Sequence, residues 1–227
     1  MTDPHDPFSD PQAVANYAEG PARNVPGWAD MLRMTDLLLS EAAPDRAKIL
    51  VVGAGGGLEL KRFAQTHARW SFHGVDPSPA MLSLARSVLG PLCHRIVLQE
   101  GFIEDAPQGP FDGATCLLTF HFVNAEDRVH MLEQVKRRLR PGAPFVSAQL
   151  SFPQGERARA KWLERYAAFV TSSGGDETKA QAAANAVGAR LTILDPEQDE
   201  AMLCAAGFTD VELFYAGLAF RGWVCRA

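Results

Sequence analysis

The stretch KILVVGAGGGLEL, residues 48–60, joins an apolar run to three glycines at alternate positions and then to a helix-like segment. A continuous apolar run is typical of a parallel strand covered on both faces. Gly53, Gly55 and Gly57 have no Cβ, so the backbone can turn tightly and a ligand can approach it closely. A helix beginning after them would direct its N-terminal amides toward that ligand. The stretch therefore predicts a strand–loop–helix unit, which is typical of a site for an adenosine-containing cofactor but also of plain strand–helix packing.

The spacing of these glycines separates two classes of cofactor. A dinucleotide-binding loop, G-x-G-x-x-G, would require glycine at position 58, where this chain has Leu58. The observed spacing disfavours a dinucleotide oxidoreductase. The commonest version of the G-x-G-x-G loop also has an acid two places before its first glycine, and here that position is Val51.

Asp76 ends the next apolar run, SFHGVD, residues 71–76. A carboxylate at the end of the second strand can accept two hydrogen bonds from ribose hydroxyls. The alternative is a helix N-cap beside the following PSPAM, and the residue could serve in both roles. We expect Asp76, followed by Pro77, to hold the ribose.

Composition indicates one ordinary globular domain. With 227 residues, 47% hydrophobic and 22% charged, the chain can bury a sizeable core. A net charge of -5 argues against broad binding to nucleic acid or to an anionic membrane. No apolar run reaches the roughly 18 residues of a membrane span, and the first residues carry no basic cluster of a signal peptide. We expect a cytoplasmic protein whose four scattered cysteines are buried free thiols.

Strand and helix patterns alternate through the middle of the chain. Apolar runs predict strands at 48–53, 71–76, 94–99, 111–123 and 143–152, with helices between them. Before them, residues 1–12 should form a mobile arm, and 13–43 a short helix, a Gly-Pro break and a longer helix. After them come a polar helical segment at 154–190, a helix closed by Gly207, and two β-type runs that must pair antiparallel.

Five such alternations and a terminal hairpin resemble the class I S-adenosylmethionine (SAM)-dependent methyltransferases. The resemblance implies an α/β, Rossmann-like, seven-stranded mixed sheet of order 3-2-1-4-5-7-6, with the last strand antiparallel and helices on both faces. In open α/β sheets the ligand lies beyond the carboxyl ends of the strands, here strands one, two and four.

A narrower resemblance is carried by both ends of the chain and by VDPSPAML. The segments RNVPGWADMLRMTDLL and AGFTDVELFYAGLAFRGWVCRA are similar to the tRNA uridine carboxymethyltransferases, which use carboxy-SAM. That family holds the extra carboxylate with an arginine, for which KAQAAANAVGAR has no convincing counterpart. We therefore expect ordinary SAM rather than carboxy-SAM, with Arg190 or Arg23 left open as a displaced partner.

The resemblance also implies a set of site residues. The expected cofactor-binding positions are Gly53, Ala54, Gly55, Gly57, Asp76, Pro77, Phe102, Ile103, Thr119 and Trp28. The family's adenine-side acid falls on Phe102, which cannot accept a hydrogen bond but could pack against the adenine face, while the Ile103 amide reaches a ring nitrogen. Glu104 or Asp105 could replace that acid through a loop shift.

Methyl transfer needs little beyond alignment of the nucleophile and exclusion of water. Thr119 is expected to be structural or to contact the methionine part, and Trp28 to cover the sulfonium or simply to pack. His121 is the candidate catalytic base; its alternative is a core-edge histidine hydrogen-bonded to backbone. No histidine or acid spacing predicts a metal.

The sequence thus predicts one domain over 1–227. Its parts are an N-terminal arm with cap helices (1–44), a SAM-binding core (45–153), a helical cap insertion (154–190), and a C-terminal helix with β-hairpin (191–227). The predicted function is methyl transfer from SAM to an unidentified acceptor, a small molecule. The alternatives are a tRNA-modifying (carboxy)methyltransferase and a non-catalytic binding or scaffold protein, which Val51, Phe102 and Leu117 motivate. Trp162, Tyr166 and Phe169 leave core packing, a homodimer and acceptor recognition open.

Overall fold

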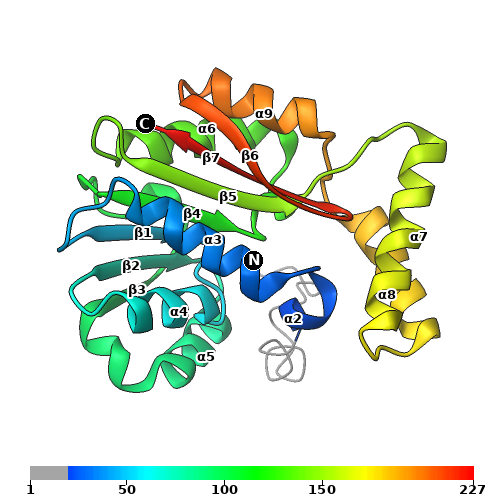
Figure 1. Cartoon of the computed structure of the whole chain (residues 1–227), viewed down its shortest axis with the longest axis horizontal. Helices are drawn as coiled ribbons and strands as arrows, with labels where there is room; N and C mark the ends of the chain where they lie inside the picture. Colours follow the sequence, from blue (N-terminus) through cyan, green and yellow to red (C-terminus); the bar gives the residue numbers. More distant parts are fainter. Residues whose placement is uncertain (1–19) are drawn as a thin grey trace.

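The computed structural model describes residues 20–227, so the arm expected at 1–12 and the helix expected just after it lie outside the described residues. The described chain forms one seven-stranded sheet of order β3-β2-β1-β4-β5-β7-β6. Helices cover both faces of this sheet (Figure 1). The predicted fold class is confirmed.

The strands are β1 (Lys48–Val52), β2 (Ser71–Asp76), β3 (Ile96–Glu100), β4 (Gly113–Leu117), β5 (Pro144–Leu150), β6 (Thr209–Gly217) and β7 (Phe220–Arg226). The α-helices are α2 (Gly20–Asn24), α3 (Trp28–Ser40), α4 (Leu58–Thr66), α5 (Pro79–Leu89), α6 (Ala125–Arg137), α7 (Glu156–Ser172), α8 (Glu177–Arg190) and α9 (Pro196–Ala205). Short 3₁₀ turns are η2 (Gly90–Arg95), η3 (Ile103–Asp105) and η4 (Phe120–Phe122).

Strand β1 shows why the apolar run has no alternation. It pairs in parallel with β2 on one side and β4 on the other. Ile49 and Val51 pack in one core layer with residues of α4, whereas Leu50 and Val52 pack in the opposite layer with residues of α6 and α9. A central strand therefore needs apolar side chains at every position, because both of its faces are buried.

The last two strands form the predicted antiparallel hairpin. β7 pairs antiparallel with both β5 and β6, which places the C-terminal strand inside the sheet and leaves β6 at its edge. Leu218, at the turn, has a left-handed φ of 50°. The tip of the hairpin extends toward α7 and α8 (Figure 1).

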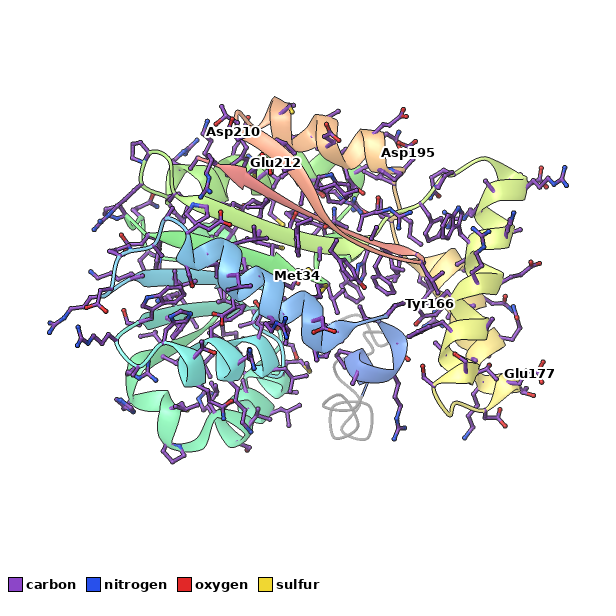
Figure 2. All side chains as sticks on the ribbon, viewed as in Figure 1. Met34, Tyr166, Glu177, Asp195, Asp210 and Glu212 are labelled. Atoms are coloured by element: carbon purple, nitrogen blue, oxygen red, sulfur yellow. The ribbon has the colours of Figure 1, made fainter. Side chains whose placement is uncertain are left out.

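The cap insertion is attached to this sheet by aromatic contacts. Trp162 of α7 stacks on Phe152, just after β5, with ring centroids 6.3 Å apart. Tyr166, one turn later, lies against Phe220 of β7 at 6.2 Å (Figure 2). These contacts favour the core-packing alternative for the insertion aromatics. The N-terminal cap joins the same hairpin, because the Tyr215 hydroxyl donates a hydrogen bond to the Pro26 carbonyl.

Three expectations need correction. The Gly-Pro break is the short helix α2, since proline fits the first turn of a helix, where its missing N–H is not needed. The fourth strand, expected over 111–123, ends at Leu117, because Leu118 turns away with a left-handed φ of 56°. The four cysteines are free as expected, but Cys204 is exposed and Cys93 half-buried rather than buried.

None of the helices in the described part of the chain is long and apolar enough to cross a membrane.

Candidate active site

The glycine loop after β1 has the geometry that its sequence predicts. Gly53, Gly55 and Gly57 have φ angles of 72°, 48° and 77°, in the left-handed region where side chains are strained. At Gly53 space is decisive as well, because an added Cβ would lie 2.1 Å from Oγ1 of Thr119. Gly57 directly precedes α4, whose first amides therefore face the loop. The loop is a tight cradle of the kind that an adenosine cofactor requires.

Asp76 joins β2 to this loop. Its Oδ2 accepts a hydrogen bond from the Gly55 N–H at 2.8 Å, and its Oδ1 accepts one from the Ser78 N–H at 2.9 Å. Ser78, rather than Asp76, caps α5 by accepting from the Met81 N–H. A carboxylate has about four acceptor positions, and these two amides use two of them. Asp76 is thereby oriented at the edge of the loop, beside exposed Pro77.

Thr119 brings the end of β4 to the same place. Its side chain lies against Gly53, and its Oγ1 donates a hydrogen bond to the Leu117 carbonyl at 3.1 Å. Gly53, Asp76 and Thr119 therefore converge from strands one, two and four, as open α/β sheets require of their ligand site. Ala54 is buried within the loop.

His121 is buried in η4 with 6% of its surface exposed. Its Nδ1 accepts the Leu150 N–H at 3.3 Å, and its carbonyl accepts the Thr192 N–H. Burial, helped by the positive charge of Arg128, lowers the pKa of His121 to about 3. A neutral ring whose Nδ1 accepts must carry its proton on Nε2, so it is poorly suited to act as a base. The geometry favours the structural alternative for this residue.

The segment after β3 presents an exposed aromatic side chain. Phe102 is 66% exposed, and its N–H donates to Oδ2 of Asp105 at 2.9 Å. Asp105 is thus engaged in closing this turn, and Glu104 forms a half-exposed ion pair with His130 at 3.4 Å. Ile103 is buried in the core. The ring of Phe102, rather than an acid, is therefore the group available on the predicted adenine side.

Trp28 begins α3 and is half-buried. It packs against the apolar cluster that joins α3, the end of β5 and α7. The structure thus places it in the cap, and a contact with the sulfonium stays a prediction.

Sequence reasoning missed an acid beneath the loop. Glu59, the second residue of α4, is 6% exposed, and its Oε1 accepts a hydrogen bond from Oγ1 of Thr115 at 2.8 Å. Burial raises the pKa of Glu59 from 4.5 to about 8, and the Thr115 hydrogen bond offsets only part of that rise. The available signal was its spacing, because Glu59 lies four residues before Phe63 on the buried face of the helix.

A second buried polar group lies farther from the loop. Arg128 of α6 forms an ion pair with Asp199 of α9 at 3.0 Å, and both side chains are almost completely buried. The same guanidinium donates to the carbonyls of Val123 and Thr192. These contacts hold Thr192, where the chain leaves the cap insertion, against the 3₁₀ turn η4 that contains His121. Neither residue was singled out from the sequence, since charged residues on two separate helices give no pattern that reveals their pairing.

A cavity of about 500 Å³ lies at the opposite end of the sheet. Its lining includes Lys48, Ser71 and Ile96, the first residues of β1, β2 and β3. It is therefore separate from the loop site at the carboxyl ends. Across residues 20–227, no group of three or more His, Cys, Asp or Glu side chains could hold a metal ion.

Comparisons with known proteins agree with this geometry. Residues 49–142 match the methyltransferase domain family. The carboxy-S-adenosyl-L-methionine synthase of Chromohalobacter salexigens is 28% identical over 222 residues, covering 95% of this chain and 81% of that protein. The ubiquinone/menaquinone biosynthesis C-methyltransferase UbiE of Geobacter sp. is 33% identical over 111 residues. This alignment covers 47% of this chain and 46% of UbiE.

Among solved structures, PigF with SAH (S-adenosylhomocysteine) has a TM-score of 0.69 at 18% identity. The alignment covers 99% of this chain but 63% of PigF, so the present chain spans less than two thirds of that protein.

The fold and the glycine loop are those of the class I SAM-dependent methyltransferases, and residues 49–142 match the methyltransferase domain family. Within that class its similarity along nearly the full length is to carboxy-SAM synthases. These relatives are named for making carboxy-SAM, whereas the terminal motifs resemble a family that uses it.

Proposed function

We propose that the chain binds SAM between the glycine loop, Asp76 and Phe102, and transfers its methyl group to a small-molecule acceptor. The observation that carries this proposal is the bond of Asp76 to the Gly55 amide, because it fixes a ribose-binding carboxylate at the edge of the loop. Ala54, Gly57, Pro77, Ile103 and Thr119 complete the proposed cofactor site.

Methyl transfer from a sulfonium is an in-line displacement that forms a bond from the nucleophile to carbon and breaks the carbon–sulfur bond. The protein mainly has to align the two at about 3–3.5 Å and exclude water. The geometry of His121 offers no strong base, so the proposed acceptor attacks without help from that residue. The cap helices α2, α3, α7 and α8 provide the surface that would exclude water and select the acceptor.

We expect an anionic small-molecule acceptor rather than a neutral one, because cationic groups lie on the cap insertion and on the neighbouring β7. The guanidiniums of Arg165 and Arg221 lie 4.5 and 5.5 Å from the ring of Trp162, beside the end of β5. This cluster is small, and the net charge of -5 argues against tRNA as the acceptor. A homodimer remains a proposal that sedimentation would test.

A second candidate function is synthesis of carboxy-SAM. Full-length similarity to the synthase of Chromohalobacter salexigens favours it. The added carboxylate needs a cation to offset its desolvation. Arg190 and Arg23 are both exposed, and a role for either in holding that carboxylate is part of this second candidate only.

Calorimetric titration of the full chain with SAM and SAH tests the proposal. Dissociation constants in the low micromolar range are expected, and no heat at millimolar ligand would favour the non-catalytic scaffold. Incubation with labelled SAM and small-molecule fractions of a lysate, followed by mass spectrometry, separates the two activities. A labelled methyl group on an acceptor supports methyl transfer, whereas a carboxylated cofactor would show the second candidate to be correct.

A further inference from the structure

Glu59 is a buried carboxyl group directly beneath the glycine loop. It lies in the first turn of α4, two residues after Gly57, and its hydrogen-bond partner Thr115 is fully buried in β4. Burying two polar groups is unfavourable compared with burying apolar ones, even when the two bond each other. An apolar pair would fill this space at lower cost, so packing alone does not account for the acid.

The position of this carboxyl relates it to Val51. Val51 of β1 and Thr115 of β4 are direct partners in the parallel register, so their side chains point to the same face of the sheet. That face is the one covered by α4, because Val51 packs in a cluster with Leu60 and Phe63. An acid at position 51 would place its carboxyl beside Thr115. Glu59 places its carboxyl at the same level of the sheet, but it does so from the helix α4 that covers this face.

We propose that Glu59 supplies the negative charge that balances the positively charged methionyl part of SAM, in place of an acid at position 51, and that it loses its proton to solvent when SAM binds. This inference rests on the proposed function, because it takes SAM as the ligand. The sulfonium carries a permanent positive charge, and a cation that approaches a buried acid favours the carboxylate.

The surroundings of Glu59 agree with this coupling. At neutral pH the free protein keeps the carboxyl protonated, because burial has raised its pKa to about 8. On β4 the neighbouring Cys116 is itself kept neutral, since burial and then Glu59 raise its pKa. Two other buried carboxylates lie on elements packed against α4. Asp76 of β2 is bonded to Gly55, and Asp36 of α3 is paired with His67 at 2.7 Å.

Calorimetry of SAM and SAH binding to the full chain between pH 6.5 and 8.5 tests the inference. The wild type should release close to one proton per SAM at pH 7. Its Kd for SAM should fall by up to about tenfold for each unit by which the pH is raised toward 8. Glu59→Gln keeps the shape and the acceptor but cannot ionise. It should bind SAM about tenfold or more weakly at pH 8, and its Kd should lack this slope.

Three comparisons make the result specific. SAH lacks the sulfonium charge, so its Kd should change less than that of SAM. Glu197→Gln, on the exposed face of α9, is the matched control and should behave like the wild type. Val51→Asp combined with Glu59→Gln returns the acid to the strand and should recover most of the lost affinity.

Each outcome separates this inference from the proposed function. Equal Kd and equal proton release in the wild type and Glu59→Gln would overturn the inference while SAM binding stood. Absence of SAM binding in the wild type would overturn both. A double variant no tighter than Glu59→Gln would refute the equivalence of positions 51 and 59. If Glu59→Gln failed to fold, the proton release of the wild type would still decide, because its absence contradicts the coupling.

Discussion

Replacement of Glu59 by glutamine should stabilise the free protein, increasingly so as pH rises. In the unfolded chain this carboxyl loses its proton near pH 4.5, whereas in the folded chain burial holds its pKa at about 8. Between those values the folded state binds more protons than the unfolded state, so the free energy of unfolding falls as pH rises. Glutamine has no proton to lose and removes this dependence.

The size of the effect follows from that pKa. Each pH unit between 4.5 and about 8 contributes up to about 1.4 kcal/mol. From pH 5.5 to 7.5 the stability difference between Glu59→Gln and the wild type should therefore grow by about 2.5 kcal/mol. Above pH 8 the difference should level off, because the folded state then ionises as well.

Urea unfolding without cofactor measures this difference. Trp223 is 1% exposed in the centre of the core, so tryptophan fluorescence reports global unfolding. Comparing the two proteins at each pH cancels the contributions that they share and isolates that of position 59. A stability difference that stays constant between pH 5.5 and 8.5 would refute the assignment of a protonated acid beneath the loop.

Three further predictions concern the cofactor site and its neighbours. Asp76→Asn should weaken SAM and SAH alike by at least about tenfold in calorimetry, because it removes a charged acceptor for the ribose; unchanged affinity would mean that the ribose lies elsewhere. Phe102→Ala should weaken both ligands about five- to tenfold by loss of stacking, with the melting temperature unchanged because the ring is 66% exposed; unaltered binding would remove Phe102 from the adenine side. His121→Asn should retain kcat within about threefold and leave its pH profile unchanged, because the pKa of His121 is about 3 and an amide oxygen can replace Nδ1 as acceptor for the Leu150 N–H; a lost basic limb would restore His121 as a catalytic base.

The sheet could be predicted from sequence because its signals are local. Strand β1 is apolar and buried at every position after Lys48, and the helices α4 and α5 begin after Gly57 and after the capping residue Ser78. Gly53 and Gly57 could be predicted for the same reason, because a left-handed backbone conformation favours glycine at a single position. The end of β4 was missed because Leu118 takes a left-handed φ that nothing in its residue type signals.

The chemistry of the site depended on contacts between distant residues, and there the sequence was less informative. Glu59 and Thr115 are separated by 56 positions and meet only because α4 crosses β4. His121 looked available as a base in a strand extended to residue 123, but the chain turns earlier and buries it against Leu150. The residue type indicates which chemistry a side chain could perform, whereas its burial determines whether the side chain is available for that chemistry.

The attachment of the cap to the C-terminal hairpin has a consequence for synthesis of the chain. Tyr215 holds the N-terminal cap at Pro26, and Phe220 contacts Tyr166 of the insertion, so both cap pieces depend on residues that leave the ribosome after strands β1 to β5. Strands β1 to β5 can assemble beforehand, since their pairing requires nothing beyond residue 150. A nascent or prematurely terminated chain would thus carry the glycine loop without its cover, exposing any bound nucleoside to water.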